Sequence, residues 1–153
     1  LANELDKLAS AAVDSGRITA ESVDELIGRT RELSNFELGD HLLANNRKRA
    51  LETLHRRLDD GAEPVMLIGL IAGNYHRLAL GKHLMMHGGR EEVFRNVSMP
   101  AFKRDAYITT LQRADAKKIA RGLQLTAAAD LAIKTSQATP RLQLEMLVCE
   151  LAN

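Results

Sequence analysis

Apolar residues recur every three or four positions along almost the whole chain, which is the period of an amphipathic helix. The alternation that a half-buried strand requires does not persist over six residues anywhere in the sequence. The pattern therefore predicts an all-α protein, a helical bundle, with nine helices. They are expected at residues 1–12, 19–33, 36–44, 47–58, 64–87, 90–96, 101–113, 115–135 and from 140 onwards.

Turn-forming and capping residues mark where these helices begin and end. Asp115 and Thr139 each precede an apolar-periodic run, and their side-chain oxygens can accept hydrogen bonds from unpaired N–H groups of the first turn. Pro64 and Pro140 fit the first turn of a helix, because the N–H that proline lacks has no partner there. The pair Gly88-Gly89 is expected to end the long helix that begins at Pro64.

Apolar stripes on the predicted helices supply the expected core. Phe, Tyr and Trp make up only 3% of the chain, so the core is expected to consist mainly of Leu, Ile, Ala and Met. The helices are expected to form two unequal packets divided near residue 34. On the long helix and the last one, the residues expected to face inward are Ile68, Ile71, Ala72, Tyr75, Leu78, Ala79, Leu144, Leu147, Val148 and Leu151.

The length of 153 residues suits one domain, or one domain with part of another. A charged fraction of 27% and the lack of an apolar run of about 18 residues exclude a membrane-spanning protein. The chain begins with Leu1, already in helical register, so we expect it to be a fragment of a longer protein. The single Cys149 has no partner for an internal disulfide, which fits a reducing cytosol.

The net charge of +1 is unevenly distributed along the chain. Residues 1–40 carry −5 and residues 142–153 carry −2, whereas residues 41–89 carry +3 and residues 90–141 carry +5. A domain that binds nucleic acid strongly is usually more basic overall. The distribution therefore favours complementary protein surfaces as partners.

Titratable residues do not form a pattern typical of catalysis. His76, His83 and His87 lie on one predicted helix, but no acidic residue accompanies the last two as in a metalloprotease helix, so a solvated face is expected. The acid pairs Asp59-Asp60 and Glu91-Glu92 diverge, because neighbours in sequence point to different sides of a helix. No P-loop pattern occurs. We therefore expect no catalytic residue, no metal and no cofactor in this chain.

Basic residues gather in two places and are candidates for contacts with phosphate. The groups are Arg47, Lys48, Arg49, Arg56 and Arg57, and then Lys103, Arg104, Arg113, Lys117, Lys118 and Arg121. From these we take Arg47, Lys48, Arg49, Lys117 and Lys118 as candidates for facing DNA. A solvated helix face is the competing interpretation, and few aromatic residues are interleaved for stacking on bases.

The C-terminal segment has a more specific pattern. Asp130 and Lys134 lie four residues apart with the acid first, which is the favourable order for an ion pair on a helix. Pro140 then sets a sharp start to an apolar helix. On physical chemistry alone, the segment is a corner between two core helices.

That segment also carries a resemblance to a known family. Residues 129–151, ADLAIKTSQATPRLQLEMLVCEL, resemble the end of the delta subunit of bacterial DNA polymerase III. NELDKLA at 3–9 and ITAESVDELI at 18–27 resemble helices of the family's lid domain, and residues 35–78 resemble the start of its collar domain. The resemblance rests on all of these segments occurring in the same order, more than on any one of them. The residues that it singles out as family-motif or subunit-interface candidates are Asp130, Lys134, Thr135, Pro140, Arg141, Leu142 and Glu145.

The resemblance implies a place in an assembly. Residues 1–33 would be the end of an AAA+ helical lid, and residues 34–153 would be the helical collar, which packs with other collars into a pentameric ring. The partners would be the delta-prime and tau/gamma subunits of the clamp loader, which loads the sliding clamp onto primed DNA for replication. An ATPase-like domain upstream of Leu1 would bind the clamp, and delta is not one of the ATP-hydrolysing subunits. The chain would be a non-catalytic part of a DNA-directed DNA polymerase, located in the bacterial cytoplasm with the nucleoid and not in a membrane.

The sequence leaves alternatives open. A delta-prime or tau/gamma subunit shares the collar architecture, and its nucleotide-binding and arginine-finger motifs would lie upstream of Leu1. Residues 36–58 and the Ala-Ile-Lys-Thr segment favour delta. A helical DNA-binding domain that uses the basic residues is an alternative from a different class. No constellation of acid and base supports an enzyme.

Overall fold

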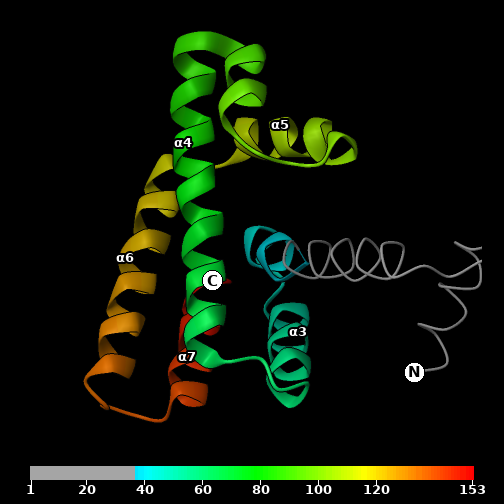
Figure 1. The fold of residues 1–153 in the computed structure, drawn as a ribbon. Coiled ribbons are helices and arrows are strands. Elements are labelled where there is room, and N and C mark those ends of the chain that lie inside the picture. Colours follow the sequence, from blue (N-terminus) through cyan, green and yellow to red (C-terminus); the bar gives the residue numbers. More distant parts are fainter. Residues whose placement is uncertain (1–36) are drawn as a thin grey trace, which may run out of the picture. The chain divides into compact units, whose positions relative to one another are not determined.

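A computed structural model describes residues 37–153 of the chain, and within that range every regular element is a helix. The all-α prediction is confirmed there, while the helices expected at 1–12 and 19–33 lie outside the described residues. The chain divides into two compact units, Leu1–Glu37 and Leu38–Asn153, and only the second is described below. Its elements are a helix at 37–43, α3 (Arg47–Asp59), α4 (Pro64–Asn96), the 3-10 helix η1 (Ala101–Lys103), α5 (Arg104–Arg113), α6 (Ala116–Lys134) and α7 (Pro140–Leu151) (Figure 1).

The long helix α4 organises the second unit. α6 runs alongside α4 in the opposite direction, and α7 turns back and packs on both of these helices (Figure 1). α3 packs on α7, and α5 packs on the far part of α4. None of the helices in the described range combines the length and apolar character that crossing a membrane requires.

The predicted capping residues perform their expected roles. The Asp115 carboxylate accepts a hydrogen bond from the Lys117 N–H at 2.8 Å and begins α6. The Thr139 hydroxyl accepts from the Leu142 N–H at 3.4 Å, and Pro140 follows as the first residue of α7. Pro64 likewise starts α4. Short-range chemistry therefore fixes these three helix starts.

The long helix reverses direction at the predicted glycine pair. Gly89 has φ 69° and ψ −163°, a conformation outside the helical region that residues with a side chain rarely adopt. The bounds of α4, Pro64–Asn96, therefore enclose two parts. A long part runs up to the glycine pair, and a short part folds back after Gly89 (Figure 1). The separate helix predicted at 90–96 corresponds to the short part. The helix expected at 101–113 differs, because it starts with the 3-10 turn η1 before α5.

Buried apolar residues form two clusters, which we call the larger core and the smaller core. The larger core consists of Leu38, Leu42, Ala50, Leu54, Leu67, Ile68, Ile71, Tyr75, Ala129, Leu144, Leu147, Val148, Leu151 and Ala152. The smaller core consists of Leu78, Val93, Val97, Ile108, Leu111 and Ile119. The four residues predicted for α7 are all buried. The prediction for α4 was partly wrong, because Ala72 and Ala79 are only half-buried and Leu67, which was not predicted, is fully buried.

Two glycines let helices approach closely at the junction of these cores. A Cβ on Gly122 of α6 would lie 2.2 Å from a ring carbon of Tyr75, so the Tyr75 ring occupies the space of the missing side chain. Gly81 of α4 similarly faces the hydroxyl of Tyr107 and the side chain of Leu111. Burial raises the pKa of the Tyr75 hydroxyl to about 12. Burial also raises the pKa of the Tyr107 hydroxyl to about 12, although the positive charge of Arg77 partly opposes this shift. Tyr107 donates its hydroxyl proton to the Arg77 carbonyl at 2.6 Å.

Candidate functional site

The end of α6 holds the first three residues that the sequence singled out. Lys134 Nζ lies 2.6 Å from Asp130 Oδ2, so the predicted ion pair is present. The Thr135 hydroxyl donates to the Leu131 carbonyl at 2.8 Å, and Thr135 is the last, capping position of the helix. All these contacts lie within one helix end. They stabilise the start of the loop that leads to α7 and leave the outer surfaces of these side chains to solvent.

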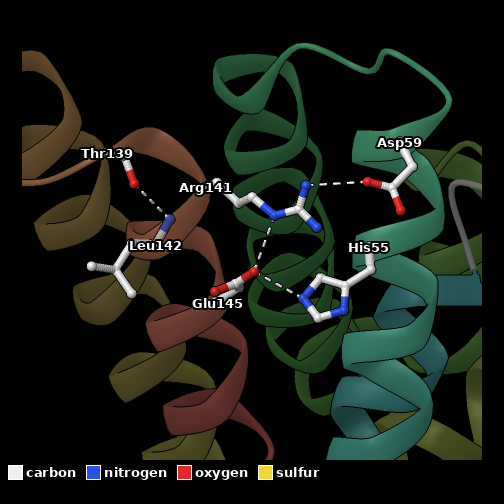
Figure 2. Close-up of polar contacts among 6 residues, drawn as sticks. All are labelled: His55, Asp59, Thr139, Arg141, Leu142 and Glu145. Carbon is white, nitrogen blue, oxygen red and sulfur yellow. Dashed lines mark hydrogen bonds and ion pairs between the residues drawn. The ribbon is translucent and has the colours of Figure 1, made fainter.

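Arg141 and Glu145, on the first turns of α7, form a polar network with α3 (Figure 2). Arg141 Nη1 lies 3.1 Å from Asp59 Oδ1, and Arg141 Nε lies 3.3 Å from Glu145 Oε1. The same Glu145 oxygen lies 2.9 Å from Nε2 of His55. Hydrogen bonds to Asp59 first, and then to Glu145, raise the pKa of Arg141 above its ordinary value. The guanidinium therefore bridges carboxylates from two helices that are distant in sequence.

This network fits a structural role better than a chemical one. Both carboxylates contact the Arg141 guanidinium, and the residues lie at the partly exposed edge of the α3–α7 contact. Exposed ion pairs add little stability, but their geometry can fix how two helices are oriented. Among the described residues, no group of three or more His, Cys, Asp or Glu side chains is arranged to hold a metal.

Apolar side chains remain exposed on α7 beside this network and also near the end of α6. Leu142 and Met146 lie one turn apart on α7 and are 46% and 49% exposed, and Leu131 near the end of α6 is 59% exposed. In Figure 2 the Leu142 side chain points away from the Arg141 network. Pro140 is exposed as well. The corner between α6 and α7 therefore combines a polar edge, fixed internally, with uncovered apolar residues, which is the composition of a protein-binding surface.

The residues predicted to face DNA lie at the starts of two helices. Arg47, Lys48 and Arg49 are exposed in the first turn of α3, and Arg47 donates to the Asn153 side-chain oxygen at 2.6 Å. Lys117 and Lys118 are exposed in the first turn of α6. Of these five residues only Lys118 lines a pocket of the described unit, and Arg47 contacts another residue of its lining, Asn153. The sequence signalled the charges but held no sign of this pocket.

The histidines occupy a solvated face, as expected. His76, His83 and His87 are exposed on α4. The rings of the last two lie 4.3 Å apart between centroids, and Nδ1 of His87 lies 2.8 Å from the His83 carbonyl oxygen. A histidine that the sequence analysis did not select, His55, instead contacts Glu145 across helices. Its partner lies 90 positions away in sequence, so no local pattern could have identified it.

Comparisons with known proteins agree with the resemblance seen in the sequence. The family model described as DNA polymerase III delta subunit, C-terminal domain, matches residues 32–151. The DNA polymerase III subunit delta of Bacillus subtilis (strain 168) is 22% identical over 149 residues, which are 97% of this chain and 43% of that protein. The solved structure of the Bacillus subtilis DNA clamp loader delta protein matches with a TM-score of 0.73 and 22% identity, over 98% of this chain and 44% of that one. The chain thus spans less than half the length of these relatives, and the structural likeness is one of fold.

Proposed function

This chain belongs to the family of the DNA polymerase III delta subunit, C-terminal domain, and we propose that it serves to assemble a bacterial clamp loader. Residues 34–153 would be the helical collar and residues 1–33 the end of the lid. The collar would pack against the delta-prime and tau/gamma subunits of the complex that loads the sliding clamp onto primed DNA. We place the protein in the bacterial cytoplasm with the replicating nucleoid.

The observation that carries this proposal is the family match over residues 32–151, which spans nearly all of the compact unit Leu38–Asn153. The whole unit, and not one short motif, therefore matches the C-terminal domain of the delta subunit, and this supports the collar assignment that we propose. A domain that acts by assembly has no need of converging acid and base groups. We accordingly expect no ATP hydrolysis by this chain, and we expect the clamp to be bound by another part of the full-length protein.

The corner of α6 and α7 is the surface that we propose for subunit contact. Leu131, Leu142 and Met146 are large apolar side chains exposed to solvent, and burying them against another subunit would be favourable. Asp130 and Lys134 lie close by and would form the charged rim. Arg141 and Glu145 would act indirectly, because they hold α7 against α3 and so fix the position of Leu142.

Assembly with purified partners tests the proposal. The full-length protein is mixed with its cognate delta-prime and tau/gamma subunits, and complex formation is followed by size-exclusion chromatography with light scattering. The wild-type protein should enter the complex. A Leu142→Glu/Met146→Glu variant should bind at least ~10-fold more weakly, because buried apolar anchors carry most of the energy of an interface.

A matched control separates surface from folding effects. Met86→Glu also places a charge at an exposed apolar residue, since Met86 is 70% exposed, but it lies on α4 away from the proposed surface. It should assemble normally, and circular dichroism should be the same for all variants. A wild-type protein that stays outside the complex would contradict the proposed function. Equal assembly by both variants would instead show that another surface makes the contact.

A further inference from the structure

We propose that His83 and His87 on α4 form a binding site for a divalent transition-metal ion such as Cu²⁺, Ni²⁺ or Zn²⁺. The two residues lie four positions apart, so their side chains project from neighbouring turns on the same face of the helix. The centroids of the two rings are 4.3 Å apart. Two imidazoles that bind one ion through nitrogens at about 2.0–2.1 Å have their ring centres at a comparable separation, so both rings are close enough to share a single ion.

A hydrogen bond to the backbone prepares His87 for this role. Nδ1 of His87 lies 2.8 Å from the carbonyl oxygen of His83. A carbonyl oxygen can only accept a hydrogen bond, so Nδ1 carries the proton and donates it. In the neutral ring the lone pair is then on Nε2, which can bind a metal. Metal-binding histidines are commonly held in this way, because the bond at the other nitrogen fixes both the tautomer and the orientation of the ring.

The surroundings leave the two rings open to an ion. His83 and His87 are exposed, and no side chain among the described residues forms a hydrogen bond or ion pair with either ring. The nearest cations in sequence have other partners. Lys82 Nζ donates to a backbone carbonyl of α5 at 3.0 Å, and Arg90 lies 2.6 Å from Asp105. The imidazole nitrogens therefore remain accessible from solvent.

The position of the pair near the end of a helical segment also favours a cation. The helical conformation of α4 is interrupted at Gly89, two residues after His87. The final carbonyl groups of a helix carry partial negative charge, and this stabilises positive charge placed beside them. Imidazole is a suitable ligand for copper, nickel and zinc, and among these divalent ions Cu²⁺ generally binds most tightly to a given set of nitrogen ligands. We therefore expect Cu²⁺ to bind more tightly than Ni²⁺ or Zn²⁺.

An open coordination sphere distinguishes this site from a structural zinc site. In a structural zinc site four protein side chains complete the coordination, and the lack of a third and a fourth ligand is the reason why the sequence predicted no metal. Here two imidazoles bind the ion, and water fills the remaining positions. The site lies on α4 and uses none of the residues at the corner of α6 and α7. The inference therefore goes beyond the proposed function and does not rest on it.

Isothermal titration calorimetry with Ni²⁺ tests the inference. The full-length protein without an affinity tag is titrated with NiCl₂, and the wild type should bind one more ion than a His83→Ala/His87→Ala variant. The single variant His87→Ala should bind that ion at least ~10-fold more weakly, because even the loss of a group that only orients a metal ligand typically has an effect of this size. Both histidines are exposed, so circular dichroism of the variants should match that of the wild type.

His76→Ala is the matched control. His76 is also exposed on α4, but it precedes His83 by seven positions, a rise of about 10 Å along the helix, so it cannot share the ion. This variant should bind Ni²⁺ like the wild type. In NMR spectra, substoichiometric Cu²⁺ should broaden the imidazole proton signals of His83 and His87 before those of His76. Equal binding by the wild type and the double variant, undiminished binding by His87→Ala, or an equal loss in His76→Ala would each overturn the proposal.

Discussion

The larger and the smaller core differ in how far apart in sequence their residues lie. The larger core joins the helix at 37–43 to α7 at the other end of the described chain. The smaller core is built from Leu78 to Ile119, a nearly continuous stretch of α4, α5 and the start of α6. Closing the larger core therefore requires long-range contacts, which cost more loop entropy than the local contacts of the smaller one.

The polar contacts around the two cores also differ in how far apart in sequence the partners lie and in how exposed their side chains are. Around the larger core, Arg141–Asp59 and Arg47–Asn153 connect distant segments through exposed side chains. Around the smaller core, Lys82 donates to the carbonyls of Leu111 and Ala114 in a partly buried position and closes the end of α5. Lys82 thus adds a partly buried polar contact to the apolar packing of the smaller core, whereas the Arg141–Asp59 and Arg47–Asn153 contacts around the larger core are exposed.

Removing one leucine from each core should have the largest effect and tests whether the cores unfold independently. Leu144→Ala and Leu111→Ala should each lower the free energy of unfolding by about 2–5 kcal/mol, because both side chains are fully buried. Urea unfolding measures the loss. Hydrogen exchange should show that Leu144→Ala loosens α3 and α7, whereas Leu111→Ala loosens the residues of the smaller core. Identical exchange patterns would mean that the two cores form one cooperative unit.

A methyl group at the junction of the cores should have a smaller effect. Gly122→Ala places a Cβ within 2.2 Å of the Tyr75 ring and should cost about 1–3 kcal/mol through overpacking. Combining it with Tyr75→Leu should cost less than the sum of the two changes, which a double-mutant cycle measures.

The matched control for that variant is another glycine in a helix. A Cβ on Gly73 of α4 would meet nothing within 4 Å, and the residue is exposed. Gly73→Ala should therefore raise stability by about 0.5–1 kcal/mol, the usual gain in a helix interior. A gain at both glycines would contradict the close packing of Tyr75 on α6.

Local chemistry in the sequence was sufficient to predict most helix boundaries. Asp115, Thr139 and Pro64 act within one turn of their own positions, so their roles do not depend on the rest of the fold. Gly89 likewise reverses the chain by its own backbone freedom. Burial was predicted less well on α4, because both cores use this helix. Near the start of α4 the buried face is wider than a single row of side chains along the helix, and it includes Leu67.

The candidate site could be predicted only as separate pieces. Asp130 and Lys134 were paired correctly because their contact is local. The contact of Arg141 with Asp59 spans 82 positions, and no pattern within a helix specifies it. The pocket between Lys118 and Asn153 exists only after five segments have packed together. Its apolar lining and the space around Gly122 are properties of tertiary structure.

The polar contacts allow a further test of the difference between the two regions. Lys82→Met removes a charged donor from the end of α5 and leaves two carbonyls without it, so it should lower stability by roughly 1–3 kcal/mol. Arg141→Gln removes exposed contacts and should change the urea midpoint less. High salt should abolish the Arg141 effect, because screening already weakens exposed pairs, and should leave most of the Lys82 effect. If Arg141→Gln cost as much as Lys82→Met at every salt concentration, the contact between α3 and α7 would support the larger core itself and not only its orientation.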